Sequence, residues 1–446
     1  MSAINLKKNI IMSGGFRIIV LILTFLISLI TARYLGVELK GKLSYIITLG
    51  GFIWLVMDFG LNRSYPYLIR KHPDKTVSMY AWTIISFVIE TLVLLALGLG
   101  FNSFWNGILG YDFNPLIMAM FILFMTMTKA FMQLQGLYMG MDKIFANSIA
   151  YLMNTAISLV ILIGAYFFLS GGDRIAIVLG ASLISLVFCI VYLIYQNKWG
   201  NWLQNFDLNF IIHSYSFGFR VFLSSLFIIF LLRADIIIVR RMLGFSDVGI
   251  YSIAAHIVDL LQIASNMVGV LLLVKLSDTE SEVAKWIMMK KMLMVFFVLL
   301  SAANIGFLIC GRFILATMFG VQFVPVYYTY LWLIPASYGL SFGSLFNNYL
   351  NSKGFPIISI ILPAIALGLN IALNILLIPL MGIYGAALAT SIAYMFWFVA
   401  IIIYEQRHTK GRMLAHLVPG RQDWHELWSL SLAYLKQGKD RIKRVK

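Results

Sequence analysis

The chain has 446 residues, of which 61% are hydrophobic and 12% are charged, and its formal net charge is +16. A soluble protein of this length carries about twice that charged fraction, so the composition excludes an ordinary soluble enzyme and indicates a membrane protein. The two cysteines, Cys189 and Cys310, lie in or at the ends of different apolar runs, which argues against a disulfide framework.

Twelve continuous apolar runs predict an all-α polytopic fold with twelve transmembrane helices. A spanning helix needs about 20 mostly apolar residues. The first run is too long for a cleavable signal peptide and continues as a helix. In chain order the runs cover residues 10–35, 43–62, 80–101, 115–137, 144–169, 174–196, 211–239, 248–274, 290–311, 325–349, 356–379 and 383–404.

The distribution of Lys and Arg between the runs predicts the orientation of the chain. If the N-terminus is cytoplasmic, the inside segments hold most of these residues, including ten in the tail after residue 404. Cytoplasmic loops carry an excess of Lys and Arg, so both termini are predicted to be cytoplasmic. The positive net charge is largely this bias, and we therefore expect no nucleic-acid partner.

The seventh run repeats a motif of the first. The shared pattern is Gly-Phe-Arg, a long apolar stretch, Arg-x-Leu-Gly, and a second glycine five residues further on. It covers residues 15–41 and again residues 218–249. Because each half has an even number of helices, both halves start on the same side of the membrane. The repeat is therefore parallel, with its pseudo-twofold axis along the membrane normal.

This repeat predicts two pseudo-symmetric six-helix bundles around a central cavity, because substrate sites of such proteins lie at the repeat interface. We expect an N-terminal bundle over 1–196, a cytoplasmic linker over 197–209, a C-terminal bundle over 210–404 and a basic tail over 405–446. In the tail, apolar residues at helical spacing predict either an interfacial helix attracted to anionic lipid or a loosely ordered solubilising segment. These residues are Trp424, Leu427, Trp428 and Leu435.

Nine ionisable residues lie inside the apolar runs. A charge at bilayer depth costs roughly 2.5–3.5 kcal/mol by insertion scales, so this set predicts a water-filled or protein-lined interior. The nine are Arg17, Asp58, Glu90, Lys129, Arg220, Arg233, Asp235, His256 and Asp259.

The cations of this set predict an anionic substrate. Arg17 and Arg220 occupy matched positions of the repeat, and Lys129 lies near the middle of the fourth run. Arginine presents a planar fork that suits phosphate oxygens. The competing interpretation is that an isolated arginine extends to the lipid headgroups. We expect a binding role for Arg17, Lys129, Arg220 and Arg233.

The acids and the histidine predict either charge compensation or coupling to H⁺ or Na⁺. For Glu90, coupling and simple pairing with Lys129 are equally compatible with the sequence. Asp58 is expected to cap or pair near Arg63, a structural role. The candidates for ion coupling are Glu90, Asp235, His256 and Asp259.

Polar side chains form stripes on several of the apolar helices. In the run 248–274, Ser252, His256, Asp259, Gln262 and Asn266 share one helical face, which predicts a cavity wall. Hydrogen bonding between helices is the competing interpretation, and it is favoured where the stripe holds only Ser, Thr and Asn. The expected polar lining comprises Asn154, Gln262, Asn266, Ser341, Asn370 and Asn374.

Two prolines, Pro335 and Pro363, fall inside predicted helices. Proline removes a backbone hydrogen bond and can kink a helix. Both positions are therefore expected hinges for alternating access.

The sequence has no phosphate-binding loop, no metal-ligand spacing and no outer loop long enough to house a catalytic site. We therefore expect no catalytic residues, no metal and no cofactor.

Several short motifs, in this order, resemble the polysaccharide-transport branch of the multidrug/oligosaccharidyl-lipid/polysaccharide exporter superfamily, which includes the O-antigen flippases. Each motif is weak alone, but the resemblance covers roughly residues 5–405. The segments that carry it are 31–36 with Gly41, 58–61, Asp235, 243–244, 248–254, 370–374 and 382–387.

The resemblance implies a flippase that moves an undecaprenyl-diphosphate-linked oligosaccharide, such as an O-antigen repeat unit, across the bacterial inner membrane. It implies a cationic cavity for the diphosphate, to which Arg17, Lys129 and Arg220 are suited, and an H⁺ or Na⁺ gradient as the drive. Membrane lipids and the polysaccharide polymerase and chain-length machinery are the implied partners. Lipid II itself is disfavoured, because the related lipid II flippases usually carry extra helices and more arginines in the first two.

Two other functions remain open. A cation-coupled multidrug exporter of the same fold is disfavoured by the intramembrane Arg and Lys residues. A membrane-embedded glycan polymerase or ligase is disfavoured by the short outer loops.

Overall fold

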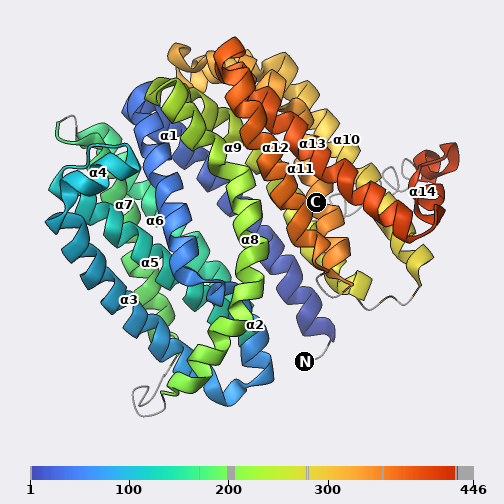
Figure 1. The fold of residues 1–446 in the computed structure, drawn as a ribbon, viewed down its shortest axis with the longest axis horizontal. Coiled ribbons are helices and arrows are strands. Elements are labelled where there is room, and N and C mark those ends of the chain that lie inside the picture. The colour runs from blue at the N-terminus through green and yellow to red at the C-terminus, as the bar shows by residue number, and fades with distance from the viewer. Residues whose placement is uncertain are drawn as a thin grey trace, which may run out of the picture. The chain divides into compact units, whose positions relative to one another are not determined.

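The computed structural model describes residues 3–169, 171–197, 206–277, 279, 281–353, 356–426 and 429. Within these ranges, the side chains of residues 3–14, 17, 220, 224, 264–275 and 277 are not part of the description. All regular secondary structure in the described ranges is helical (Figure 1).

The first half of the chain consists of seven α-helices and one short 3₁₀ helix. The second half also consists of α-helices, with a short π-helix and a short 3₁₀ helix on either side of Gly320. The first-half elements are α1 (Ala3–Asp58), α2 (Leu61–Lys71), η1 (Pro73–Lys75), α3 (Thr76–Gly100), α4 (Asn102–Leu109), α5 (Pro115–Gly140), α6 (Ile144–Phe168) and α7 (Arg174–Tyr195). The second-half elements are α8 (Leu208–Met242), α9 (Phe245–Ser277), α10 (Glu282–Ile314), η2 (Leu315–Phe319), η3 (Val321–Phe323), α11 (Pro325–Asn351), α12 (Ile358–Met381), α13 (Ile383–His408) and α14 (Arg412–Leu417).

The predicted all-α membrane fold is confirmed, and each of the twelve apolar runs lies on a helix. Within the described residues, eight helices are long and apolar enough to cross a membrane, or nine if the bent pair Leu208–Leu223 and Ser225–Met242 is one span. The first two runs share α1, which is broken at Gly36 (φ 74°, ψ −180°). A left-handed φ is easy only for glycine, so Gly36 separates two helices within one continuous element.

The two copies of the repeat meet through equivalent residues. A Cβ on Gly41 would lie 1.8 Å from the carbonyl oxygen of Phe245, and a Cβ on Gly249 would lie 2.1 Å from that of Val37. Val37 follows the glycine of Arg-x-Leu-Gly in the first copy of the motif, and Phe245 follows the same glycine in the second copy. The contact is therefore reciprocal, as at a local twofold axis. We call this crossing of α1 and α9 the repeat contact. It explains why both copies carry the second glycine.

Two compact units divide the chain, and each is described by itself. Unit 1 comprises Met1–Ala254, Phe313–Thr329 and Ile371–Ala386, and unit 2 comprises Ala255–Arg312, Tyr330–Asn370 and Ala387–Lys446. The expected boundary between two six-helix bundles at 197–209 stays a prediction, and residues 198–205 of that linker lie outside the described residues.

The core of unit 1 is built around α5. Its side chains are buried on most of its circumference, including Phe131, Leu134 and Tyr138. A helix that is apolar all round is buried on all sides, and α5 accordingly packs against α2, α3 and α7. Two polar residues, Lys129 and Gln133, are buried on the same helix and therefore need partners on its neighbours.

In unit 2, α11 and α13 pack closely at small residues and at a proline. Pro335 lies inside α11, and the hydroxyl of Ser391 on α13 inserts beside it. This hydroxyl accepts from the Ala336 N–H (3.2 Å) and donates to the Trp332 carbonyl (2.5 Å). Ser391 thus bridges two backbone groups that a regular helix would join directly, an identifiable cause of bending. The hinge expected at Pro335 therefore has a partner on α13, whereas Pro363 lies within α12.

Candidate functional site

A buried ion pair joins α3 and α5 near their middles. Lys129 is 1% exposed, and its ammonium pairs with Glu90 Oε1 and lies 3.3 Å from Ser86 Oγ. One turn away, Thr91 Oγ1 donates to Thr126 Oγ1 (2.9 Å) and continues the polar contact between the two helices. Of the two sequence interpretations of Glu90, the structure shows the pairing with Lys129.

The second oxygen of Glu90 sets this pair apart from a simple structural bridge. Glu90 Oε2 is buried with no hydrogen-bond partner among the described residues, while the side chain as a whole is 24% exposed. A carboxylate oxygen in that position is able to take a proton or to ligate a cation. The geometry therefore leaves ion coupling at Glu90 open as a proposal beside the observed pairing.

Asp58 ends α1 and holds the start of α2. Its carboxylate accepts from the Asn62 N–H at 3.2 and 3.3 Å and from Gln133 Nε2 at 2.9 Å. Between Asp58 and α2 the backbone passes through positive φ at Phe59 (49°) and Gly60 (81°). Asp58 thus has the capping role expected from the sequence, and its Gln133 contact lies one turn along α5 from Lys129.

Arg63 is a cation that the sequence indicated only as a neighbour of Asp58, with no binding role. The structure places it on α2, exposed, with Nη1 donating to Ser225 Oγ of α8 at 2.6 Å. This approach depends on Gly60, because a Cβ there would lie 2.3 Å from the carbonyl oxygen of Gly218. The break at Asp58-Phe59-Gly60 was the available signal that a second helix starts here with Arg63 in its first turn.

The side chains of Arg17, Arg220 and Asn266 lie outside the described residues, although their backbones are helical. Neighbouring rings locate two of these backbones. Phe16 packs edge-on against Phe145 of α6 with ring centroids 5.8 Å apart. Phe219 stacks on Phe59 at 5.3 Å, so the backbone next to Arg220 runs beside the start of α2. Binding roles for Arg17 and Arg220 remain predictions.

Asp235 ties α8 to α9 close to the repeat contact. It is 1% exposed, receives a hydrogen bond from the Tyr251 hydroxyl and a second from the Ile236 N–H (2.8 Å). Tyr251 precedes Ser252, whose Oγ accepts from Ser44 Oγ at 3.0 Å. Ser44 and Ser252 are equivalent positions of the repeat, three residues after its second glycine. Asp235 therefore holds α8 next to α9 through Tyr251, which neighbours Ser252. Arg233 lies half-buried two residues before Asp235 on α8.

Several residues of the predicted polar lining form hydrogen bonds between helices. Ser185 Oγ of α7 donates to Asn154 Oδ1 of α6 (2.8 Å), Gln262 Nε2 of α9 donates to Ser344 Oγ of α11 (2.9 Å), and Asn370 Nδ2 of α12 lies 3.3 Å from Thr390 Oγ1 of α13. These are the contacts that hydrogen bonding between helices requires. Lining of a cavity by this set remains a prediction. Ser341 and Asn374 are buried, and His256 and Asp259 lie half-buried on α9.

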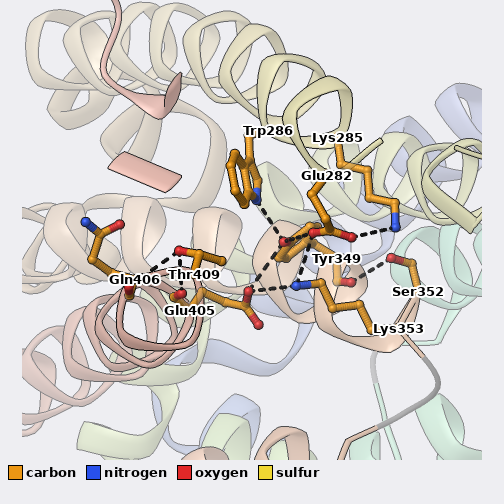
Figure 2. A network of polar contacts seen from close by, with 9 residues as sticks. All are labelled: Glu282, Lys285, Trp286, Tyr349, Ser352, Lys353, Glu405, Gln406 and Thr409. Atoms are coloured by element: carbon orange, nitrogen blue, oxygen red, sulfur yellow. Dashed lines mark hydrogen bonds and ion pairs between the residues drawn. The ribbon is translucent and has the colours of Figure 1, made fainter. Parts of the chain in front are cut away.

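A second charged network, which the sequence analysis did not foresee, joins three helix ends in unit 2. Figure 2 shows Tyr349 and Lys353 at the end of α11 between Glu282 of α10 and Glu405 of α13. Lys353 Nζ lies 2.8 Å from Glu405 Oε2 and 3.4 Å from Glu282 Oε2, and the Tyr349 hydroxyl lies 3.0 and 3.3 Å from Glu282 Oε2 and Glu405 Oε2. Trp286 Nε1 donates to the same hydroxyl at 2.9 Å.

The environment of Lys353 favours its charged form. Burial alone lowers the pKa of this lysine, but the hydrogen bonds with Glu405 and Tyr349 raise the pKa well above its ordinary value. Lys353 therefore carries its charge at neutral pH. Across the residues that the structure describes, no group of three or more His, Cys, Asp or Glu residues is placed to hold a metal ion.

Comparisons with known proteins give the fold a context. The chain resembles the solved structure of the lipid II flippase MurJ in an inward closed conformation, with a TM-score of 0.71 and 15% identity over 89% of this chain and 87% of that one. It also resembles the inward-facing conformation of a multidrug resistance MATE transporter of the MOP superfamily (TM-score 0.66, 14% identity, 89% and 95% coverage). At these identities the likeness shows a shared fold.

A third similar structure is a MOP superfamily transporter from Pyrococcus furiosus, whose title reports a binding pocket of reverse polarity (TM-score 0.62, 14% identity, 93% and 97% coverage). No curated protein sequence matches the chain. The profile of a family described as polysaccharide biosynthesis protein matches residues 6–274. Since this match spans more than half of the chain, the protein belongs to the polysaccharide biosynthesis protein family and has the fold of MOP superfamily transporters.

Proposed function

We propose that this protein is a flippase that moves an undecaprenyl-diphosphate-linked oligosaccharide, an O-antigen or related repeat unit, across the bacterial inner membrane. The observation that carries the proposal is a set of cations on transmembrane helices of a polysaccharide biosynthesis family member. Lys129, Arg220 and Arg233 lie on α5 and α8, and Arg17 lies on α1. The lipid II flippase fold is compatible with a lipid-linked substrate.

The cations give the substrate its chemical class. A diphosphate offers oxygens that accept charge-assisted hydrogen bonds, and arginine presents two parallel donors to such a group. Arg63 joins the predicted set, because it is exposed on α2 and contacts α8, the helix that bears Arg220. We expect Arg63 to exchange its neutral partner Ser225 for a phosphate oxygen when substrate binds.

The ion pair of Glu90 and Lys129 supplies a way to couple transport to protons. In the structure Glu90 neutralises Lys129. When an anionic substrate becomes the partner of Lys129, Glu90 loses its counter-ion and its charged form is disfavoured, so it takes up a proton. His256, Asp259 and Asp235 are the further candidates for this role.

Alternating access requires that contacts between the two repeats open and close. With both termini cytoplasmic, as we propose, the repeat contact at Gly41 and Gly249 lies toward the outer face. Its opening would release the substrate outward. Because Ser44 Oγ and Ser252 Oγ are 3.0 Å apart, cysteines at both positions are placed to form a disulfide that holds the contact closed.

The test of the proposal is the glycan phenotype of a strain that lacks the protein. We expect loss of the surface glycan and accumulation of lipid-linked repeat units inside the cell, both restored by the wild-type chain. Lys129→Gln should fail to restore them, while the matched control Lys143→Gln, which removes an exposed lysine that contacts Asn197, should succeed. Normal glycan display without accumulation in the deletion strain would refute the flippase.

A cross-linking experiment tests the alternating-access step separately. In a background without Cys189 and Cys310, the variant Ser44→Cys/Ser252→Cys should lose transport on oxidation and recover it on reduction. The two single-cysteine variants serve as controls and should be insensitive. Full transport by the oxidised double variant would show that this contact does not open.

A multidrug exporter remains the second candidate, because MATE transporters share the fold. A cationic drug is disfavoured as a substrate beside Lys129 and Arg63. Drug efflux that survives Arg63→Ala but is lost in Asp259→Asn would favour this alternative over the flippase.

A further inference from the structure

The chain does not leave the protein surface where α13 ends. We call residues 406–426 the tail segment. Its helix α14 buries Met413 and Leu417, which are 0% and 7% exposed. The ring of His416 stacks on Trp286 of α10 with centroids 5.8 Å apart. The tail segment is therefore docked on unit 2 by apolar and aromatic contacts.

The acidic side chains in and next to the tail segment face the protein. Asp423 pairs with Lys290 at 2.6 Å and Glu426 with Lys291 at 2.8 Å, both on α10. The remaining acid of this stretch, Glu405, immediately precedes the tail segment and pairs with Lys353. The protein itself thus neutralises every carboxylate between residues 405 and 426.

The cations of the tail segment are exposed to the surroundings of the protein. The four Lys and Arg side chains of this segment are exposed, and none of them has an ion pair within the described part of the chain. Apolar side chains accompany them on the surface, with Leu414 37%, Val418 64% and Trp424 39% exposed. The four cations are Arg407, Lys410, Arg412 and Arg421.

The position of this surface is fixed before any partner binds. Gln406 Oε1 accepts from the Leu414 N–H (2.9 Å), and its Nε2 donates to the Gly411 carbonyl (2.8 Å). Gln406 and Thr409 sit beside Glu405 at the edge of the network in Figure 2. The turn out of α13 is thus held by hydrogen bonds from Gln406, the residue next to Glu405 of the network.

We propose that the tail segment is a docking surface for the anionic lipid headgroups of the leaflet at which α13 ends. The charge sorting carries this inference, because each acid of the stretch has a lysine partner while the four cations have no ion-pair partner among the described residues, which leaves the exposed surface of the tail segment with a net positive charge. Covalent continuity favours a lipid over a protein partner, since α13 spans the membrane and α14 begins four residues after its last residue. Exposed Trp and aliphatic residues among cations suit the boundary between headgroups and acyl chains.

The size of the effect follows from the number of cations. A Lys or Arg near an anionic surface strengthens attachment by about fivefold each at low ionic strength. We therefore expect anionic lipid to slow hydrogen exchange of the tail segment by at least an order of magnitude. Because the attraction is screened, the effect should shrink with added salt.

The experiment uses the full chain in nanodiscs of phosphatidylcholine, alone or mixed with phosphatidylglycerol. Hydrogen exchange of peptides covering residues 406–426 is the readout. A fluorophore on Val418→Cys, in a background without the native cysteines, provides a second readout that senses burial in lipid. We expect slower exchange and a blue-shifted emission only with phosphatidylglycerol.

Two variants make the result specific. The variant Arg407→Gln/Lys410→Gln/Arg412→Gln/Arg421→Gln should lose the difference between the two lipids and keep the ion pairs with α10. Single replacements compare Arg412→Gln, which should weaken the difference, with Arg312→Gln at the opposite end of α10, which should not.

Equal exchange in both lipids, or an unchanged lipid effect in the fourfold variant, would overturn the proposal. Protection by an acidic protein, with no effect of phosphatidylglycerol, would also overturn it and assign the surface to a protein. None of these outcomes depends on what the protein transports.

Discussion

Two lysine–carboxylate contacts, one in each unit, hold their charges in opposite ways. In unit 1, Lys129 is 1% exposed near the middle of a transmembrane helix, and its charged partner is a single acid, Glu90. In unit 2, Lys353 is 27% exposed just after α11, and it lies between two acids, with Tyr349 and Trp286 completing the network. The first contact is sparse and deep, and the second is dense and close to the helix ends.

This difference separates two reasons for keeping charges in a membrane protein. A buried pair must overcome the desolvation of both ions, and it does so only when the remaining polar atoms are satisfied. The network of Lys353 approaches that condition, which suits a structural clamp on three helix ends. Glu90 Oε2 lacks a partner among the described residues, so the pair in unit 1 is poorly optimised for stability. That is the expected condition of a pair whose partners change during a transport cycle.

The largest predicted effect is in unit 1. Glu90→Gln leaves the buried ammonium of Lys129 without its counter-ion and should lower the free energy of unfolding by about 3–5 kcal/mol. Thermal or denaturant unfolding in detergent measures this loss. The double variant Glu90→Gln/Lys129→Gln should regain most of the stability, because no uncompensated charge remains, yet it should not transport. Equal stability of the single and double variants would show that the buried ammonium of Lys129 does not need Glu90 as its counter-ion.

A smaller effect is expected in unit 2. Lys353→Gln should lower the free energy of unfolding by about 2 kcal/mol, because a charge-assisted contact is lost while the Tyr349 hydroxyl still donates to one of the acids. Transport should stay within about twofold of wild type, since a clamp on helix ends contributes stability and touches no substrate. Transport assays on stability-matched samples, prepared at lower temperature, separate the two effects. Loss of transport at full occupancy of the folded state would make this network part of the transport cycle.

Removal of one hydroxyl sharpens the comparison further. Tyr349→Phe should cost about 2 kcal/mol, because a charge-assisted hydrogen bond to a carboxylate disappears and the buried Trp286 Nε1 loses its acceptor, while Lys353 keeps both acids. The matched control in unit 1 is Ser86→Ala, which removes the one hydroxyl that contacts Lys129. We expect Ser86→Ala to be less destabilising than Tyr349→Phe, since it removes one contact of 3.3 Å with the ammonium while Lys129 keeps its ion pair with Glu90. Thermal unfolding of both variants in the same detergent provides the comparison.

The sequence was sufficient for features that depend on local pattern. Runs of apolar residues located the helices of the described chain that are long and apolar enough to span a membrane, and the repeated glycines marked two positions, Gly41 and Gly249, at which the structure shows close backbone contact. Both features depend on the spacing and the size of residues, and these properties can be read directly from a sequence. Pro335 marked an interruption in the backbone hydrogen bonds of α11 for the same reason, although Ser391, whose hydroxyl contacts the Ala336 N–H, lies 55 residues beyond Ala336 and no pattern connects the two.

Features that depend on which helices become neighbours were beyond the sequence. The pairing of Glu90 with Lys129 remained one of two options, because an acid on one helix and a lysine on another imply no distance. Arg63 was expected only as a neighbour of Asp58, since α2 is short and polar and its sequence does not indicate which helix it contacts. The ion pairs that dock the tail segment could not be predicted from the sequence, for a related reason. Asp423 lies far in sequence from Lys290, and only the return of the chain after α13 brings the two together.

The smallest predicted effect is the acid response of the tail segment. The hydrogen bond from Lys290 holds the pKa of Asp423 below its ordinary value, and the Gly420 N–H adds to this. A carboxyl whose pKa is depressed in the folded state stabilises that state fully above the unfolded pKa of about 3.9, and the contribution disappears as the pH falls through the lower folded value. A fluorophore at Val418→Cys should therefore report a docked tail segment at neutral pH and down to about pH 4. Release is expected only below that pH.

Asp423→Asn, which keeps the shape but not the charge, should weaken docking at neutral pH and remove this part of the acid transition. A release of wild type already near pH 6 would mean that the Lys290–Asp423 pair does not control docking.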